Sequence, residues 1–179
     1  GAGYPFTLTA EGRARVLRGA CEDLSIPEPL GPLYDLGRAV GTLLHIAGAE
    51  GPRLRLFSEA LQLFDRPGLA TLLVIEDVHW ADDATLDLIR FLGRRIGGTH
   101  ILLLLTARND ATDGQRRLRR ALAEMPPQAL FRMEVPLLSQ GAVADLATPA
   151  GLDPSSVFRL TAGNPFFTTE LIRAGSVDT

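Results

Sequence analysis

The sequence of 179 residues contains no lysine, and all 18 of its basic residues are arginine. Any chemistry that requires a lysine side chain is therefore excluded from this chain. Cysteine is almost absent as well, because Cys21 is the single one. One cysteine permits no disulfide within the chain, which fits a protein of a reducing compartment.

Long apolar runs are also missing. No stretch approaches the roughly 20 apolar residues of a membrane span, and the N-terminus lacks a charged region followed by an apolar one. Hydrophobic residues make up 46% and charged residues 22% of the chain, as in a globular protein. The formal net charge of −3 gives no general attraction to nucleic acid. We therefore expect a cytoplasmic protein with no membrane partner and one sizeable core.

The stretch TLLVIEDVHWAD, residues 71–82, is the most informative one. Its apolar half, 71–75, predicts a strand that leads directly into Glu76 and Asp77. In an open α/β sheet the ligand crevice lies at the carboxyl ends of the strands, so acids there are placed for a ligand. Two adjacent carboxylates repel each other unless a cation, a proton or a donor lies between them. A magnesium ion held against a nucleotide phosphate is one explanation, and two solvated loop acids are the other.

Three further segments have the character of strands. Residues 14–20 have the pattern of a short strand in which arginines flank Val16 and Leu17. The apolar run ILLLL at 101–105 lacks alternation, which indicates a strand covered on both faces of a parallel sheet. FRMEV at 131–135 alternates strictly and should be half buried. Helical spacing separates the strands, so the sequence predicts an α/β fold with right-handed parallel crossovers. The predicted helices are 33–49, 53–65, one capped by Asp82 or Asp83, and 115–125.

The last forty residues show no strand pattern. Ser139 and Ser155 can each cap a short helix, and a final helix spans 166–174. We therefore expect an α/β core over 14–137 and a small helical segment over 138–179. Residues 1–13 form an extended segment whose origin the sequence leaves open.

Four motifs occur in an order that resembles a known family. These are RVLRGACEDLSIPEPLGPLYDL, LLVIEDVHWADDATLDLIRFL, LLLLTAR and GNPFFTTEL, which together span roughly residues 14 to 174. They resemble the signal-transduction ATPases with numerous domains, especially the AAA-type ATPase module of large LuxR-family transcriptional regulators. The resemblance implies a parallel-sheet P-loop NTPase-like core with a helical lid, and ATP and Mg²⁺ as cofactors.

The same resemblance implies roles for individual residues. Glu76 stands where the family has its magnesium-coordinating acid, and Asp77 where a second acid positions or activates water. Arg108 matches the sensor position that reads the γ-phosphate. The lid turn beside the adenine is matched by Gly163, Asn164 and Pro165. His79 and Trp80 also match the family pattern, and Trp80 is expected to be a packing anchor.

One required motif is missing. Such ATPases use G-x-x-x-x-G-K-[ST], whose amides cradle phosphates and whose lysine reaches the β and γ oxygens. A chain without lysine cannot contain it. In the family's sheet the first strand lies beside the sensor strand, so its loss leaves a gap next to 101–105. Unpaired strand edges promote association, and we expect Tyr4–Thr9 or a second copy of the chain to fill the gap.

These observations together lead to a functional expectation. We expect an incomplete or degenerate ATPase module of a nucleotide-regulated LuxR-type regulator that binds ATP weakly or not at all and has little or no activity. DNA would be contacted only through a domain outside this sequence. A non-catalytic interaction module that keeps the fold is the alternative, as is the same module from a cyclase- or kinase-linked protein.

Overall fold

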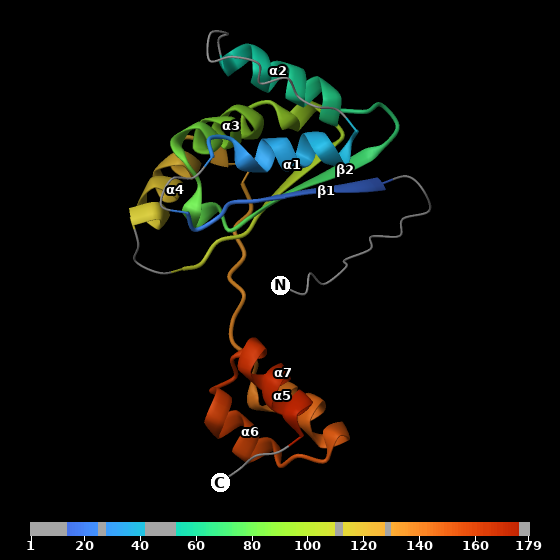
Figure 1. Ribbon diagram of the computed structural model, residues 1–179, viewed down its shortest axis with the longest axis vertical. Coiled ribbons are helices and arrows are strands. Elements are labelled where there is room, and N and C mark those ends of the chain that lie inside the picture. The colour runs from blue at the N-terminus through green and yellow to red at the C-terminus, as the bar shows by residue number, and fades with distance from the viewer. Residues whose placement is uncertain (1–13, 25–27, 42–52, 110–112, 128–129, 176–179) are drawn as a thin grey trace. The chain divides into compact units, whose positions relative to one another are not determined.

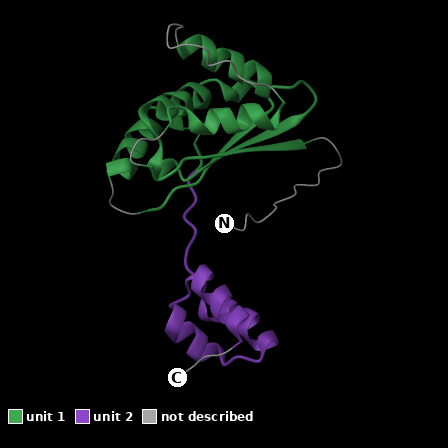
Figure 2. Ribbon diagram, viewed as in Figure 1, with its two compact units in different colours: residues 1–131 green, residues 132–179 purple. Residues whose placement is uncertain are grey.

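The computed structural model describes residues 14–24, 28–41, 53–109, 113–127 and 130–175. The chain divides into two compact units, residues 1–131 and 132–179, which are treated separately below (Figure 2). The prediction for residues 1–13, including Tyr4–Thr9, falls outside the described residues. None of the described helices is both long and apolar enough to cross a membrane.

The first unit is built on a parallel sheet of three strands. These are β1 (Ala14–Ala20), β2 (Ala70–Glu76) and β3 (Ile101–Leu105), in the order β1-β2-β3. The register aligns Val16 with Leu72 and Leu72 with Leu102. The predicted α/β class with a parallel sheet is confirmed. The parallel register brings the carboxyl ends of all three strands to one edge.

In the described part of the first unit, four helices accompany this sheet. They are α1 (Gly31–Ala39), α2 (Arg53–Phe64), α3 (Asp83–Gly93) and α4 (Asp113–Ala123), with short 3₁₀ turns η1 (Val78–Trp80) and η2 (Ile96–Gly98). The sequence predicted each helix, but the first was expected to reach residue 49 and ends at Ala39. It ends there because Gly41 follows with a left-handed φ of 73°, a common way to terminate a helix.

The described helices of this unit all lie on one face of the sheet (Figure 1). The face beneath them carries alternate strand residues, among them Leu73 and Ile75, which are fully buried. On the opposite face Leu102 and Leu104 are 67% and 45% exposed. The prediction that 101–105 is covered on both faces is therefore wrong for the described part of the chain. A run of five apolar residues is compatible with a strand covered on one face and with a strand covered on both. The sequence pattern therefore could not distinguish these two arrangements.

The segment 131–135 is not a strand. Residues 130–139 make no strand in the structure, and Phe131, Met133 and Val135 are 88%, 72% and 82% exposed. The predicted half-buried strand is therefore wrong. Alternating apolar and polar residues give a strand one apolar face, but a strand also needs a neighbouring strand to bind its backbone N–H and C=O groups. No described strand pairs with this segment.

The second unit contains α5 (Gln140–Ala147), the 3₁₀ turn η4 (Thr148–Ala150), α6 (Pro154–Thr161) and α7 (Pro165–Ala174). Its small core consists of Val143, Ala147 and Val157, packed against partly buried apolar neighbours. Ser139 caps α5 as predicted, since its side chain accepts the N–H of Ala142. The cap of α6 is Asp153 rather than the predicted Ser155, because the carboxylate lies one residue before the first helical position.

Candidate functional site at the carboxyl edge of the sheet

Asp77, the residue directly after β2, has a left-handed backbone conformation, with φ 55° and ψ 39°. Such values are uncommon outside glycine, and aspartate tolerates them better than most residues. The turn is held in place by Thr106, directly after β3. The Asp77 N–H donates to Thr106 Oγ1 at 3.1 Å, and the Val78 N–H donates to the Thr106 carbonyl at 2.9 Å. The end of β2 is thereby fixed to the end of β3.

The two neighbouring carboxylates have different partners. Glu76 Oε1 lies 3.8 Å from Arg18 Nη1 of β1, while Asp77 Oδ1 lies 3.9 Å from Nδ1 of His79. Both acids are partly exposed, with 45% and 46% of their side chains accessible. An exposed ion pair of this kind contributes about 1 kcal/mol or less, so Glu76 can exchange Arg18 for another cation at little cost.

Arg108 belongs to the loop that follows β3, and it lies beside the same turn. Its backbone N–H points to His79 Nδ1 at 3.5 Å, and its carbonyl accepts the side-chain amide of Gln115 in α4. The guanidinium carbon of Arg108 lies 5.2 Å from the centroid of the Trp80 ring, within cation–π range. The structure therefore brings together Asp77 and Arg108, two of the residues that the family resemblance singled out.

Sequence reasoning missed Thr106, and it noted His79 only as a match to the family pattern, without a chemical role. His79 is 4% exposed and packs its ring against Trp80 with centroids 4.4 Å apart. Helix α4 approaches closely behind it, because a Cβ on Gly114 would lie 1.9 Å from the His79 carbonyl oxygen. Thr106 could have been noticed as the first polar residue after ILLLL. The contact of His79 with Arg108 depends on how β2 and β3 are aligned, so no local sequence pattern could predict it.

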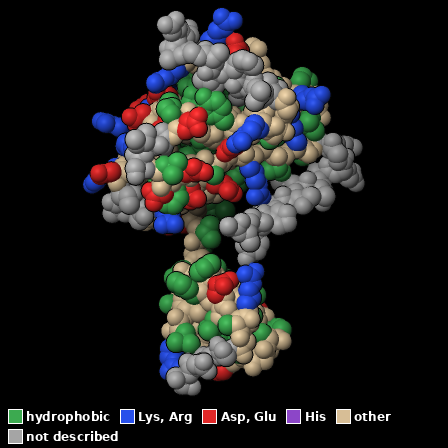
Figure 3. All heavy atoms as spheres, viewed as in Figure 1, with side chains coloured by type: hydrophobic (Ala, Val, Ile, Leu, Met, Phe, Trp, Pro, Cys, Tyr) green, Lys and Arg blue, Asp and Glu red, His purple; other side chains and the backbone are tan. Residues whose placement is uncertain are grey.

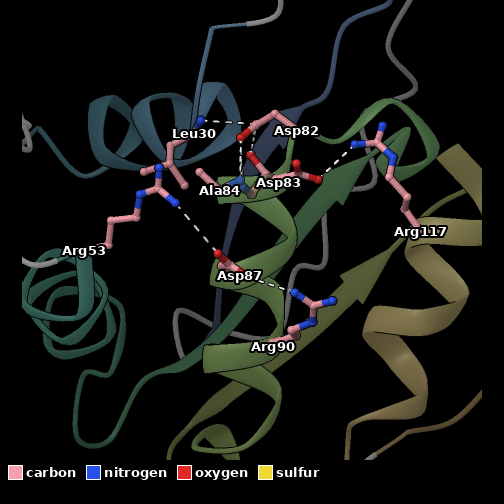
Figure 4. A network of polar contacts seen from close by, with 9 residues as sticks. Leu30, Arg53, Asp82, Asp83, Ala84, Asp87, Arg90 and Arg117 are labelled. Atoms are coloured by element: carbon pink, nitrogen blue, oxygen red, sulfur yellow. Dashed lines mark hydrogen bonds and ion pairs between the residues drawn. The ribbon is translucent and has the colours of Figure 1, made fainter. Parts of the chain in front are cut away.

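Helix α3 begins at this edge and is tied to its neighbours by carboxylates (Figure 4). Asp82 caps the helix by accepting the N–H groups of Ala84 and Thr85 at 2.8 and 3.1 Å. Asp83 pairs with Arg117 of α4 at 3.0 Å. Of the two capping candidates in the sequence, Asp82 is thus the cap, and Asp83 links α3 to α4.

A cavity of about 190 Å³ lies near the end of β1 and the start of α1. It is smaller than the roughly 300–1,000 Å³ usual for small-molecule sites. Its lining includes Cys21, whose thiol is buried. Burial, followed by the negative charges of Asp82 and Asp77, raises the pKa of Cys21 to about 12. Cys21 is therefore a neutral thiol at physiological pH and not a nucleophile.

Acidic side chains gather on part of the first unit's surface in the space-filling view (Figure 3). Within the described part of the chain, however, no three histidine, cysteine, aspartate or glutamate side chains form a group that could hold a metal ion. Mg²⁺ needs only one or two protein carboxylates when phosphates and waters complete its shell. Glu76 and Asp77 meet that lower requirement, provided that Glu76 releases Arg18. The residues therefore fit Mg²⁺ only together with phosphate ligands.

Gly163, Asn164 and Pro165 lie in the second unit and have a local structural explanation. Gly163 has a φ of 75°, and a Cβ there would lie 2.2 Å from the Leu138 carbonyl oxygen. Asn164 caps α7 by accepting the N–H groups of Phe166 and Phe167 at 2.9 and 3.3 Å. Pro165 occupies the first turn of α7, where proline is favoured. The local fold of the turn is therefore enough to explain these three residues without any ligand. Their place beside an adenine stays a prediction.

No protein-family model matches the chain, and no curated protein matches it.

Proposed function

We propose that this chain is the acid and sensor half of a nucleotide-binding module, an ATPase-like core of the kind found in LuxR-type transcriptional regulators. The observation that supports the proposal best is the convergence of Asp77, His79 and Arg108 where β2 and β3 end. A carboxylate and a guanidinium at the carboxyl edge of a parallel sheet suit a magnesium-bound phosphate.

Each side chain would have a separate task. Asp77 would orient or deprotonate a water molecule that attacks the terminal phosphoryl group, and Arg108 would stabilise the negative charge on its oxygens. Glu76 would hold Mg²⁺ after releasing Arg18. The ion, when bound, neutralises phosphate charge. Because the sequence offers no lysine and no glycine-rich phosphate loop, we expect weak binding and little or no turnover.

A titration followed by tryptophan fluorescence tests this proposal. Trp80 is the single tryptophan of the chain, and it lies beside Arg108, so its emission reports on the site directly. Phosphate groups that attract Arg108 away from the ring should change the emission. We expect a response to Mg²⁺–ATP with a Kd of about 1 mM or weaker, a smaller response without Mg²⁺, and none in R108A.

R120A is the matched control, because Arg120 is an exposed arginine of α4 in the same unit. It should respond as the unchanged chain does. A micromolar Kd for Mg²⁺–ATP would contradict the expectation that the site is incomplete and binds nucleotide weakly. The absence of any Mg²⁺-dependent response at millimolar nucleotide would reject the nucleotide-binding proposal.

The second candidate is a non-catalytic interaction module. It is favoured by the uncovered sheet face with Leu102 and Leu104, since wholly parallel sheets are almost always covered on both faces. This candidate would be supported if the chain showed no response to nucleotide and its self-association were lost when Leu102 and Leu104 were replaced by polar residues.

A further inference from the structure

His79 is the most deeply buried ionisable side chain at the edge of the sheet. Only 2% of its side chain is exposed, and its Nε2 has no hydrogen-bond partner among the described residues. Its Nδ1 lies between a donor and an acceptor, 3.5 Å from the Arg108 nitrogen and 3.9 Å from Asp77 Oδ1. No task in the proposed mechanism uses this side chain directly.

We propose that His79 is a positioning residue whose unprotonated Nδ1 accepts the backbone N–H of Arg108 and thereby holds the Arg108 side chain over Trp80, beside Asp77. As a statement about nucleotide recognition this rests on the proposed function. As a statement about Arg108 it rests on the contacts alone.

Among the described residues, two side chains bind the backbone of Arg108. The residue belongs to no helix or strand, and both of its main-chain polar groups bind side chains. His79 receives the N–H, and Gln115 of α4 donates to the carbonyl. Backbone groups next to a buried edge need such partners. The position of Arg108 therefore depends on two side chains from two different elements.

His79 is itself fixed on its other side. Gly114 packs so closely against its carbonyl oxygen that no larger residue fits there. Its ring lies against Trp80, and Trp80 in turn lies below the Arg108 guanidinium. The pair His79-Trp80 thus contacts both the backbone and the side chain of Arg108, and a shift of one contact would displace the other.

Packing alone does not explain a histidine at this place. An apolar residue could fill the same space without burying Nε2 unpaired, and an unpaired buried donor is unfavourable. In the neutral ring only one nitrogen carries the proton. An N–H donor facing Nδ1 requires the proton to be on Nε2, although that atom has no hydrogen-bond partner in the described part of the chain. The acceptor at Nδ1 is therefore the property that distinguishes histidine from an apolar residue here.

Two substitutions separate positioning from packing. In H79N the side-chain oxygen can take the place of Nδ1, whereas in H79Q the polar atoms take the place of Nε2. The readout is the difference in Trp80 emission between each variant and its own R108A double mutant, measured without nucleotide. We expect H79N to retain most of this difference and H79Q to lose it. A packing role predicts the opposite order, because asparagine leaves the larger void.

The tautomer provides a second test in which His79 itself is left unchanged. The chain has three histidines, so nitrogen NMR of the ring of His79 can be assigned with His45 and His100 replaced. We expect an unprotonated Nδ1 and a protonated Nε2. A ring protonated on Nδ1 in the neutral form, or equal emission differences in H79N and H79Q, would overturn the proposal.

Nucleotide titration then links the two proposals. If the chain responds to Mg²⁺–ATP, H79Q should weaken the response by up to about tenfold, the worth of one net hydrogen bond, while H79N stays close to the unchanged chain. If the unchanged chain shows no response, the proposed function fails, while the emission and tautomer measurements still decide the role of His79.

Discussion

The carboxylate of Asp82 accepts the backbone N–H of Leu30 at 3.3 Å, across 52 positions of sequence. Leu30 is the residue before α1 and has a left-handed φ of 63°, with no side-chain cap of its own. One carboxylate therefore supports the beginnings of two helices, α1 and α3 (Figure 4).

Replacing Asp82 should consequently destabilise the first unit by more than an ordinary cap does. We expect D82A to lower the free energy of unfolding by about 2 kcal/mol, since it removes the α3 cap and leaves the buried Leu30 N–H without its acceptor. D82N is the matched control, because its side-chain oxygen can still accept, and it should cost less than half as much. Urea denaturation followed by circular dichroism measures both, and equal losses would contradict the capping role.

Strands β2 and β3 were predictable because each contains a short apolar run, and β1 was predictable because its arginines flank the apolar pair Val16 and Leu17. Residues 71–75 and 101–105 lie within one residue of β2 and β3, and 14–20 coincides with β1. Helix α2 was predicted equally well, since its apolar residues recur on one side and Arg66-Pro67-Gly68 follows it. These features are local, and local pattern was sufficient to find them.

What the sequence could not reveal depends on neighbours in space. Phe131, Met133 and Val135 alternate like a strand, yet they are exposed, because pairing is decided by a second strand. The adjacent acids at the end of β2 were predicted to form one site, but Glu76 pairs with Arg18 and Asp77 lies beside His79. The contact between His79 and Arg108 joins segments 29 positions apart and depends on the register of β2 with β3.

The close approach of α4 to the turn gives a second prediction. A Cβ on Gly114 would meet the His79 carbonyl at 1.9 Å, whereas a Cβ on Gly31 would meet nothing within 4 Å. We expect G114A to cost about 1–3 kcal/mol of unfolding free energy through overpacking. G31A, also within a helix of the first unit, should be neutral or stabilising by up to about 1 kcal/mol. Thermal denaturation of the two variants checks this, and a neutral G114A would show that α4 can move away freely.

The single thiol should be unreactive. Because burial and the charges of Asp82 and Asp77 raise the pKa of Cys21 from 9.0 to about 12, the folded chain keeps the thiol proton well above neutral pH. The difference of three pKa units means about a thousandfold less thiolate at pH 8 than in the unfolded chain. Alkylation by iodoacetamide should be at least about a hundredfold slower in the folded chain than in urea. D82N should speed it up by removing one repelling charge.

The same shift predicts how stability changes in alkali. Between pH 9 and pH 12 the unfolded chain releases the Cys21 proton while the folded chain retains it, so the unfolded state binds fewer protons. Stability from this group is therefore complete below pH 9 and is lost as the pH rises towards 12. C21A should show a flatter decline of unfolding free energy over that interval, and an unchanged decline would contradict the assignment to Cys21.

The open face of the sheet allows a prediction in which neighbouring leucines behave differently. Leu102 is 67% exposed, whereas Leu103 packs against the main core. L102S with L104S should change the free energy of unfolding by no more than about 0.5 kcal/mol per site, as is usual for exposed positions, while L103A should cost about 2 kcal/mol. The double serine variant should also bind less of the dye ANS and associate less in sedimentation. A large loss of stability in that variant would mean that a part of the chain outside the described residues covers this face.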